Sequence, residues 1–200
     1  MLLALITALS SASAQVNSYI EYVNVFLGTT NGGNMFPGVV AGPFAMVKLG
    51  PDVHDGNTDA YSGYLPSGSI TGFSMMHESG TGGAPKYGVV SQMPVVGSVT
   101  NPLLDLGRNR SEPDKAEVGY YKSSLDSCVT IEVAATDHAG MYQYTFPWNE
   151  SNVVVDVSHV LPSYRGLGWA QGYAGGSFSV FEDGHYEGSG VYNNGWNLGW

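Results

Sequence analysis

The sequence predicts an all-β fold, a sandwich of two antiparallel sheets made from about ten short strands. Three observations predict it: apolar and polar residues alternate in short runs, turn residues separate the runs, and no window keeps apolar residues at helical spacing between good caps. The 28 glycines and 10 prolines among the 200 residues follow no period, which excludes a collagen-like chain and fits tight turns between strands.

Five strands are expected before residue 126. The runs are VNVFLG at 23–28, FAMVKLGPD at 44–52, ITGFSMM at 70–76, GVVSQMPVVGSV at 88–99 and GYYKSSL at 119–125. Turn residues separate the runs, and none keeps apolar residues at helical spacing between caps, so we interpret each as a strand.

The clearest hairpin is predicted at residues 129–146, VTIEVAATDHAGMYQYTF. Val129, Ile131 and Val133 alternate with polar or small residues, which puts the apolar set on one face of a strand. Residues 137–140, DHAG, supply turn chemistry before the second strand returns.

A further strand and a second hairpin follow. Residues 152–161, NVVVDVSHVL, are expected to form the strand, and residues 177–192 the hairpin, with Asp183-Gly184 in a two-residue type I′ turn. No internal repeat and no linker divides the chain, so we expect one domain over residues 15–200.

The first 14 residues, MLLALITALSSASA, have the pattern of a secretory signal peptide. They contain an apolar run without charged side chains and end in the small-x-small sequence Ala12-Ser13-Ala14. The run is too short to span a bilayer, and no longer apolar run follows it. We therefore expect a secreted protein with no membrane segment.

The charge and the single cysteine exclude several classes of protein. Seven basic and 17 acidic residues give a net charge of −10, which disfavours nucleic acid and anionic membranes as partners and favours a neutral or cationic ligand. Cys128 is the only cysteine, so no intrachain disulfide forms, and we expect it to pack as a small apolar residue. Asn109 and Asn149 begin N-x-S sequons and are candidate glycosylation sites.

Residues 73–88, FSMMHESGTGGAPKYG, place a histidine and a glutamate before a glycine-rich loop. Spacing excludes a zinc-protease helix, because His-Glu-x-x-His lacks its second histidine. The loop also lacks the Gly-Lys-Ser/Thr of a phosphate-binding loop, the last glycine of G-x-G-x-x-G, and the G-x-S-x-G of a nucleophile elbow.

An open loop with polar groups is what this motif still allows. His77, Glu78, Ser79, Thr81 and Lys86 offer donors and acceptors that suit sugar hydroxyls, and the glycines let a ligand approach the backbone. The alternative is a glycine-rich turn whose histidine and glutamate bond only to nearby backbone.

Several segments in one order resemble the N-terminal domain of glycoside hydrolase family 92, the calcium-dependent exo-acting α-mannosidases. VNVFLGT, FPG and PFAMVKLGPD resemble the family's V-N-P-F-I-G-T, F-P-G and P-F-G-M-V-Q-L-S-P-D, and ITGFSMMHESGTGG resembles I-x-G-F-S-H-T-H-L-S-G-T-G. The similarity runs from about residue 23 to residue 196.

This resemblance implies a β-sandwich related to galactose-mutarotase-like domains, in an enzyme that removes terminal α-mannose from N-glycans or mannan with inversion. It also implies that the acid, the base and the calcium ligands lie on a following helical domain. We therefore expect a sandwich incomplete at its C-terminus, no catalytic residue and no metal in this chain, and little or no activity from it alone.

The candidate substrate-binding residues lie in the loop and in the preceding segment, residues 52–64. Of the family's two histidines in F-S-H-T-H, the second is kept as His77 and the first is replaced by Met75. Asp52, at a predicted strand end, either bonds a mannose hydroxyl or caps a turn. Tyr61 and Tyr64 either stack on the sugar ring or pack in the core.

Two further histidines, His138 and His159, lie outside the glycine-rich loop. We expect His159 to be a buried, hydrogen-bonded residue and His138 to be exposed in its hairpin turn. The rival from another class is a standalone, lectin-like carbohydrate-binding sandwich, which would bind mannose without turnover.

Overall fold

The computed structural model describes residues 19–40, 44–54, 60–78, 88–104, 106–166 and 170–194. Their only helices are two 3-10 turns, η1 (Ile20–Tyr22) and η2 (Tyr164–Gly166). The strands are β1 (Val39–Val40), β2 (Lys48–His54), β3 (Ser69–Ser74), β4 (Ser91–Val96), β5 (Lys115–Glu117), β6 (Tyr120–Ser124), β7 (Thr130–Ala135), β8 (Gly140–Thr145), β9 (Ser151–Asp156), β10 (Gln171–Val180) and β11 (Tyr186–Asn194). Across the described stretches no helix is long and apolar enough to cross a membrane.

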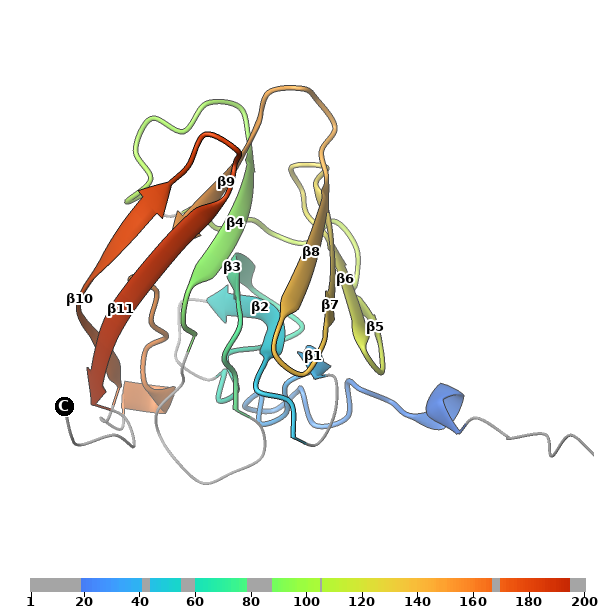
Figure 1. The fold of residues 1–200 in the computed structure, drawn as a ribbon. Helices are drawn as coiled ribbons and strands as arrows, with labels where there is room; N and C mark the ends of the chain where they lie inside the picture. The colour runs from blue at the N-terminus through green and yellow to red at the C-terminus, as the bar shows by residue number, and fades with distance from the viewer. Residues whose placement is uncertain are drawn as a thin grey trace, which may run out of the picture.

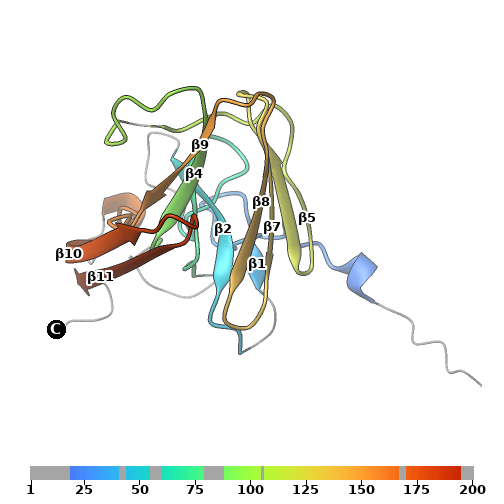
Figure 2. The ribbon, with the colours of Figure 1, turned by 45° about the horizontal axis from the view of Figure 1, so that its top comes forward.

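The strands form two sheets and a separate hairpin. The five-stranded sheet has the order β1-β2-β3-β4-β9, the four-stranded sheet β5-β6-β7-β8, and β10 pairs with β11. Every pairing is antiparallel among the described strands. Both views show the four-stranded sheet on one side and the β10–β11 hairpin on the other, with β2, β4 and β9 between them (Figures 1 and 2). The predicted all-β antiparallel sandwich is confirmed.

The core fills the space between the two larger sheets. Leu49 and Phe73 of the five-stranded sheet and Tyr121 and Ile131 of the four-stranded sheet are each 0% exposed and belong to one apolar cluster. In β7 the apolar members of the alternating pattern are the buried ones. Burying one such side chain contributes about 1.5–3 kcal/mol, so this interface holds the two sheets together.

Gln92 links the two sheets and the β10–β11 hairpin through side-chain hydrogen bonds. Gln92 of β4 accepts a hydrogen bond from the hydroxyl of Tyr144 in β8 at 2.8 Å. Its amide Nε2 donates to the Tyr186 hydroxyl in β11 at 2.7 Å. Because Gln92 is nearly buried, these bonds satisfy groups that would otherwise lose their water partners.

Most of the predicted strands are confirmed, and one is wrong. Strands overlap the predicted ranges 44–52, 70–76, 88–99, 119–125 and 152–161, and both predicted hairpins are present. Residues 23–28 instead form turns. The Asn24 side chain accepts from the Phe26 amide at 3.0 Å, and Gly28 has φ of 84°. This local side-chain bond competes with strand pairing and fixes a turn.

The tip of the second hairpin differs from the predicted two-residue turn. The Gly184 amide donates to the Phe181 carbonyl at 3.0 Å, and the Phe181 amide donates to the His185 carbonyl at 2.8 Å. Gly184 has φ of 83°, whereas Asp183 has no positive φ, which a type I′ turn requires at both central residues. The loop therefore has three residues, with glycine in the left-handed position.

The expectation for Cys128 is also wrong. Its side chain is exposed, and its backbone has φ of 62° in the turn between β6 and β7. The Cys128 amide donates to the Leu125 carbonyl at 2.9 Å, so the residue closes a tight turn at the surface. His138 is exposed in the β7–β8 turn, as predicted.

Candidate functional site

Several loops meet at one end of the five-stranded sheet. The amide of Tyr61 donates to the Gly32 carbonyl at 2.9 Å, and the amide of Ser62 donates to the Gly33 carbonyl at 2.7 Å. The Ser62 hydroxyl also donates to the Met35 carbonyl at 3.1 Å. These bonds fix the segment before β1 against the segment before β3, beside the residues that follow β3 and β9.

A buried aspartate lies at the centre of this end. Asp52 of β2 is 0% exposed. Its Oδ1 accepts from His77 Nε2 at 2.7 Å and from the Ser74 hydroxyl at 3.0 Å, and its Oδ2 accepts from His159 Nε2 at 2.8 Å. His77 Nδ1 donates to the Lys48 carbonyl at 2.8 Å. We call Asp52, Ser74, His77 and His159 the Asp52 cluster; it ties β2 to the segments after β3 and β9.

The electrostatics of the Asp52 cluster favour a charged Asp52 and a charged His159. Burial alone raises the pKa of Asp52, but His77 and His159 outweigh it and hold the pKa well below its ordinary value. Burial lowers the pKa of His159, yet the Asp52 carboxylate raises it above the ordinary 6.5. A carboxylate and an imidazolium therefore stabilise each other inside the protein.

Aromatic stacking and two glycines shape the space around the histidines. The Phe36 ring stacks on the His77 ring, with centroids 3.8 Å apart and planes 9° from parallel. A Cβ at Gly63 would lie 3.2 Å from the His77 ring, and a Cβ at Gly88 would lie 3.2 Å from the His159 ring. Both glycines have positive φ, so a side chain there would be strained as well as crowded.

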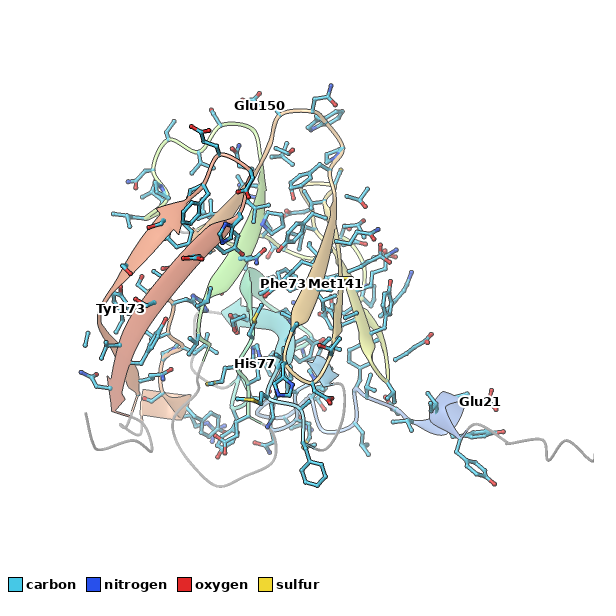
Figure 3. All side chains as sticks on the ribbon, in the orientation of Figure 1. Glu21, Phe73, His77, Met141, Glu150 and Tyr173 are labelled. Atoms are coloured by element: carbon cyan, nitrogen blue, oxygen red, sulfur yellow. The ribbon has the colours of Figure 1, made fainter. Side chains whose placement is uncertain are left out.

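The glycine-rich loop is anchored at its base. The Gly88 amide donates to the Met76 carbonyl at 2.8 Å, which joins the two ends of the loop. His77, 3% exposed, is held in the Asp52 cluster directly after the first end, and half-buried Glu78 follows it. Figure 3 shows His77 at the end of the sheet opposite Glu150. Ser79, Thr81 and Lys86 lie outside the described residues.

The other predicted site residues divide between core and surface. Asp52 lies inside β2 rather than at its end, so it is no turn cap. Tyr64 is 1% exposed and its hydroxyl donates to Asp114 at 2.9 Å, which makes it a packing residue in this chain. Tyr61 is half-buried, and its ring lies edge-to-face with the Tyr164 ring, with centroids 5.0 Å apart. Of the two tyrosines, Tyr61 has surface to offer a ligand.

His159 is a hydrogen-bonded, mostly buried histidine, as predicted, but its partner was not foreseen. It is 107 positions from Asp52 in sequence, and no local pattern links residues so far apart. Asn109 and Asn149 are both exposed, as an acceptor of a glycan must be, and their glycosylation stays a prediction.

The groups around Asp52 bear on two possible roles of this end of the sheet, holding a metal and acting as an acid or base. Within the described ranges no three His, Cys, Asp or Glu side chains gather where they could hold a metal ion. Both oxygens of the buried Asp52 carboxylate accept hydrogen bonds from two imidazoles and a hydroxyl, so protein groups already use this carboxylate. These bonds hold in place the segments that follow β3 and β9.

A pH-dependent stability follows from the His159–Asp52 pair. Since folding raises the pKa of His159, the charged pair stabilises the folded state fully below pH 6.5. This stabilisation is lost as the pH rises through the raised pKa. We expect His159→Gln, which keeps a donor but does not titrate, to flatten the fall in Tm as the pH rises above 6.5. His138→Gln, at an exposed position, serves as the control. A Tm profile unchanged by His159→Gln contradicts the pairing.

Comparison with known proteins gives matches that agree with one another. Residues 22–199 match the family model described as the glycosyl hydrolase family 92 N-terminal domain. A curated relative from Arthroderma benhamiae, named an uncharacterized secreted glycosidase, is 35% identical over 178 residues, which are 81% of this chain and 23% of the relative.

Two solved structures from Bacteroides thetaiotaomicron share the fold. A family GH92 α-mannosidase superposes with a TM-score of 0.74 at 26% identity, over 90% of this chain and 25% of its own. A family GH92 inverting mannosidase superposes with a TM-score of 0.68 at 23% identity, over 92% of this chain and 24% of its own. The chain thus spans about a quarter of the length of the relatives that it matches.

Proposed function

Since the chain belongs to glycosyl hydrolase family 92 as its N-terminal domain, we propose that it is the substrate-binding domain of a secreted α-mannosidase. The substrates are terminal α-mannosidic bonds of N-glycans or mannan, hydrolysed with inversion. A solved relative at 26% identity is an α-mannosidase, which supports this substrate class. The family match favours part of a hydrolase over a standalone lectin.

The observation that carries the proposal is the anchored loop base at the Asp52 cluster. A loop that binds sugar must hold its donors in place, because ordering a mobile loop on binding costs affinity. Here Asp52 fixes His77, and the Met76–Gly88 bond closes the loop. In the proposal, Glu78, Ser79, Thr81 and Tyr61 contact the sugar, whereas Asp52 and His77 are positioning residues.

The reaction needs groups beyond those in the described residues. Inversion uses one carboxylic acid to protonate the leaving oxygen and one carboxylate to activate water, about 6.5–9.5 Å apart. Because Asp52 is enclosed and bonded, we assign both roles, and the calcium ligands, to the remainder of the longer enzyme. The chain alone then binds weakly and does not hydrolyse.

Secretion is part of the same proposal. The relative at 35% identity is named a secreted glycosidase, and residues 1–14, which lie outside the described residues, have the signal-peptide pattern. An enzyme that trims glycans outside the cell contributes to glycoprotein catabolism. Detecting the processed protein in the culture medium, with an N-terminus near Gln15, tests this assignment.

Kinetics of the complete enzyme that carries this domain test the binding role. We expect Tyr61→Ala to lower kcat/KM for α-mannosides by roughly fivefold, the equivalent of about 1 kcal/mol of aromatic contact. Tyr19→Ala is the matched control, because Tyr19 is 72% exposed and lies near the start of the chain, away from Tyr61 in sequence. An unchanged kcat/KM for Tyr61→Ala removes this residue from the site, and absence of α-mannosidase activity in the parent enzyme refutes the proposed function.

A further inference from the structure

A small cavity of about 160 Å³ lies on the five-stranded sheet. Its apolar walls come from Met93 of β4, Val154 of β9, and Leu104 and Leu106 from the segment that follows β4. Met93 and Val154 are paired neighbours across the two strands, so their side chains share one face. Figure 1 shows that the segment following β4 leaves the sheet at its upper end.

The same cavity has a polar end. Ser91, Asp156 and His159 line it, and Ser91 and Asp156 are paired across β4 and β9. Ser91 is 4% exposed, and its side chain fits over Gly72, where a Cβ would lie 2.0 Å from the Ser91 hydroxyl. A bulkier residue at Gly72 would therefore displace this hydroxyl.

Bonding capacity is left over at this polar end. Asp156 Oδ1 accepts from the Ser158 amide at 2.8 Å and from the Ser158 hydroxyl at 2.6 Å, which leaves Oδ2 available. His159 bonds Asp52 through Nε2, which leaves Nδ1. Ser91 lines the cavity, and among the described residues no protein group bonds its hydroxyl. A ligand with hydroxyl groups could therefore bond this group without displacing a protein partner.

We propose that this cavity binds a neutral molecule with neighbouring hydroxyl groups next to a short apolar part, no larger than one sugar ring. The hydroxyls bond Ser91, Asp156 and His159, and the apolar part packs on Met93 and Val154. A cavity of similar size, about 150 Å³, accommodates a molecule the size of benzene. The Asp156 carboxylate repels anions, and the volume excludes a branched glycan.

The proposed ligand site goes beyond the proposed sugar-cleft function. It lies on the face of the sheet under the segment after β4, and it shares only His159 with the Asp52 cluster. Two sources fit the same chemistry, an alkyl diol and a deoxy sugar ring. Their apolar parts differ in shape, so separate titrations distinguish them.

Methyl NMR of the purified 200-residue chain tests the site, because Met93 is a reporter in its wall. The chain is labelled with ¹³C-methyl methionine, and Met93→Leu assigns the signal. Titration with 1,2-hexanediol and, separately, methyl α-L-fucopyranoside should shift the Met93 methyl saturably, with Kd on the order of 1 mM for at least one of them. A wild-type Met93 signal that does not respond saturably to either compound overturns the proposal.

Neighbouring valines on opposite faces of β9 provide matched variants. Val154→Phe fills the cavity and should weaken binding at least about tenfold, while Val153→Phe, at a position that is 40% exposed on the other face, should leave Kd unchanged. Ser91→Ala removes one hydroxyl and should weaken binding about threefold to tenfold. Equal Kd values for the wild type and Ser91→Ala overturn the assigned polar end even where Val154→Phe does not fold.

Discussion

Replacing Asp52 with asparagine should lower the free energy of unfolding by about 3–5 kcal/mol, the cost of removing one partner from a buried ion pair. The carboxylate is 0% exposed and accepts three hydrogen bonds, from His77, Ser74 and His159. Asparagine keeps the shape, but its amide nitrogen is a donor and would face an N–H or O–H donor. His159 would lose the carboxylate that raises its pKa.

Urea unfolding at neutral pH measures this change, with Asp137→Asn as the control. Asp137 is exposed in the β7–β8 turn, so its substitution should stay within about 0.5 kcal/mol of the wild type. A loss below about 1 kcal/mol for Asp52→Asn would show that the carboxylate is not the tie between the three segments.

Arg110→Leu should destabilise the domain by a similar amount, about 3–5 kcal/mol, at a second buried pair. Arg110 Nε donates to Asp114 at 2.6 Å, and the two side chains are 7% and 2% exposed. The guanidinium also donates to the Gly68 carbonyl at 2.8 Å and to the Leu65 carbonyl at 3.0 Å. Leucine would leave the Asp114 carboxylate without its cation and two carbonyls without a donor.

Arg108 provides the matched control for this prediction. Its guanidinium donates to the carbonyl of its own neighbour, Gly107, at 3.0 Å, and the structure gives it no carboxylate partner among the described residues. Arg108→Leu should therefore change the free energy of unfolding by no more than about 1 kcal/mol. Equal losses for Arg110→Leu and Arg108→Leu would contradict a specific role for the Asp114 pair.

Patterns of period two predicted the strands that form the core. In residues 129–133 apolar and polar residues alternate strictly, and β7 occurs there with Ile131 and Val133 buried, followed by β8 after the predicted turn. Residues 23–28 were misassigned because the Asn24 side chain bonds to the Phe26 amide, a local effect that hydropathy does not register. The two-residue strand β1 and the three-residue strand β5 are too short to show any period.

The candidate site was predictable only in its local part. The histidine and glycine-rich loop of residues 73–88 stand next to each other in sequence, and the family resemblance that they helped to carry is confirmed. The bonds that hold the loop base are not local, since Asp52 reaches His77 across 25 positions and His159 across 107. Pairing of β4 with β9 brings the segment with His159 to the same end of the sheet. This pairing could not be predicted from the sequence alone.

The most direct test of the central claim follows the anomers of the released sugar. The complete enzyme carrying this domain is incubated with an α-linked mannobiose in the presence of calcium, and ¹H NMR records the first mannose to appear. We predict β-mannose first, as inversion requires, and no release by the 200-residue chain alone. No mannose release by the complete enzyme, α-mannose as the first product, or turnover by the isolated chain would contradict the account.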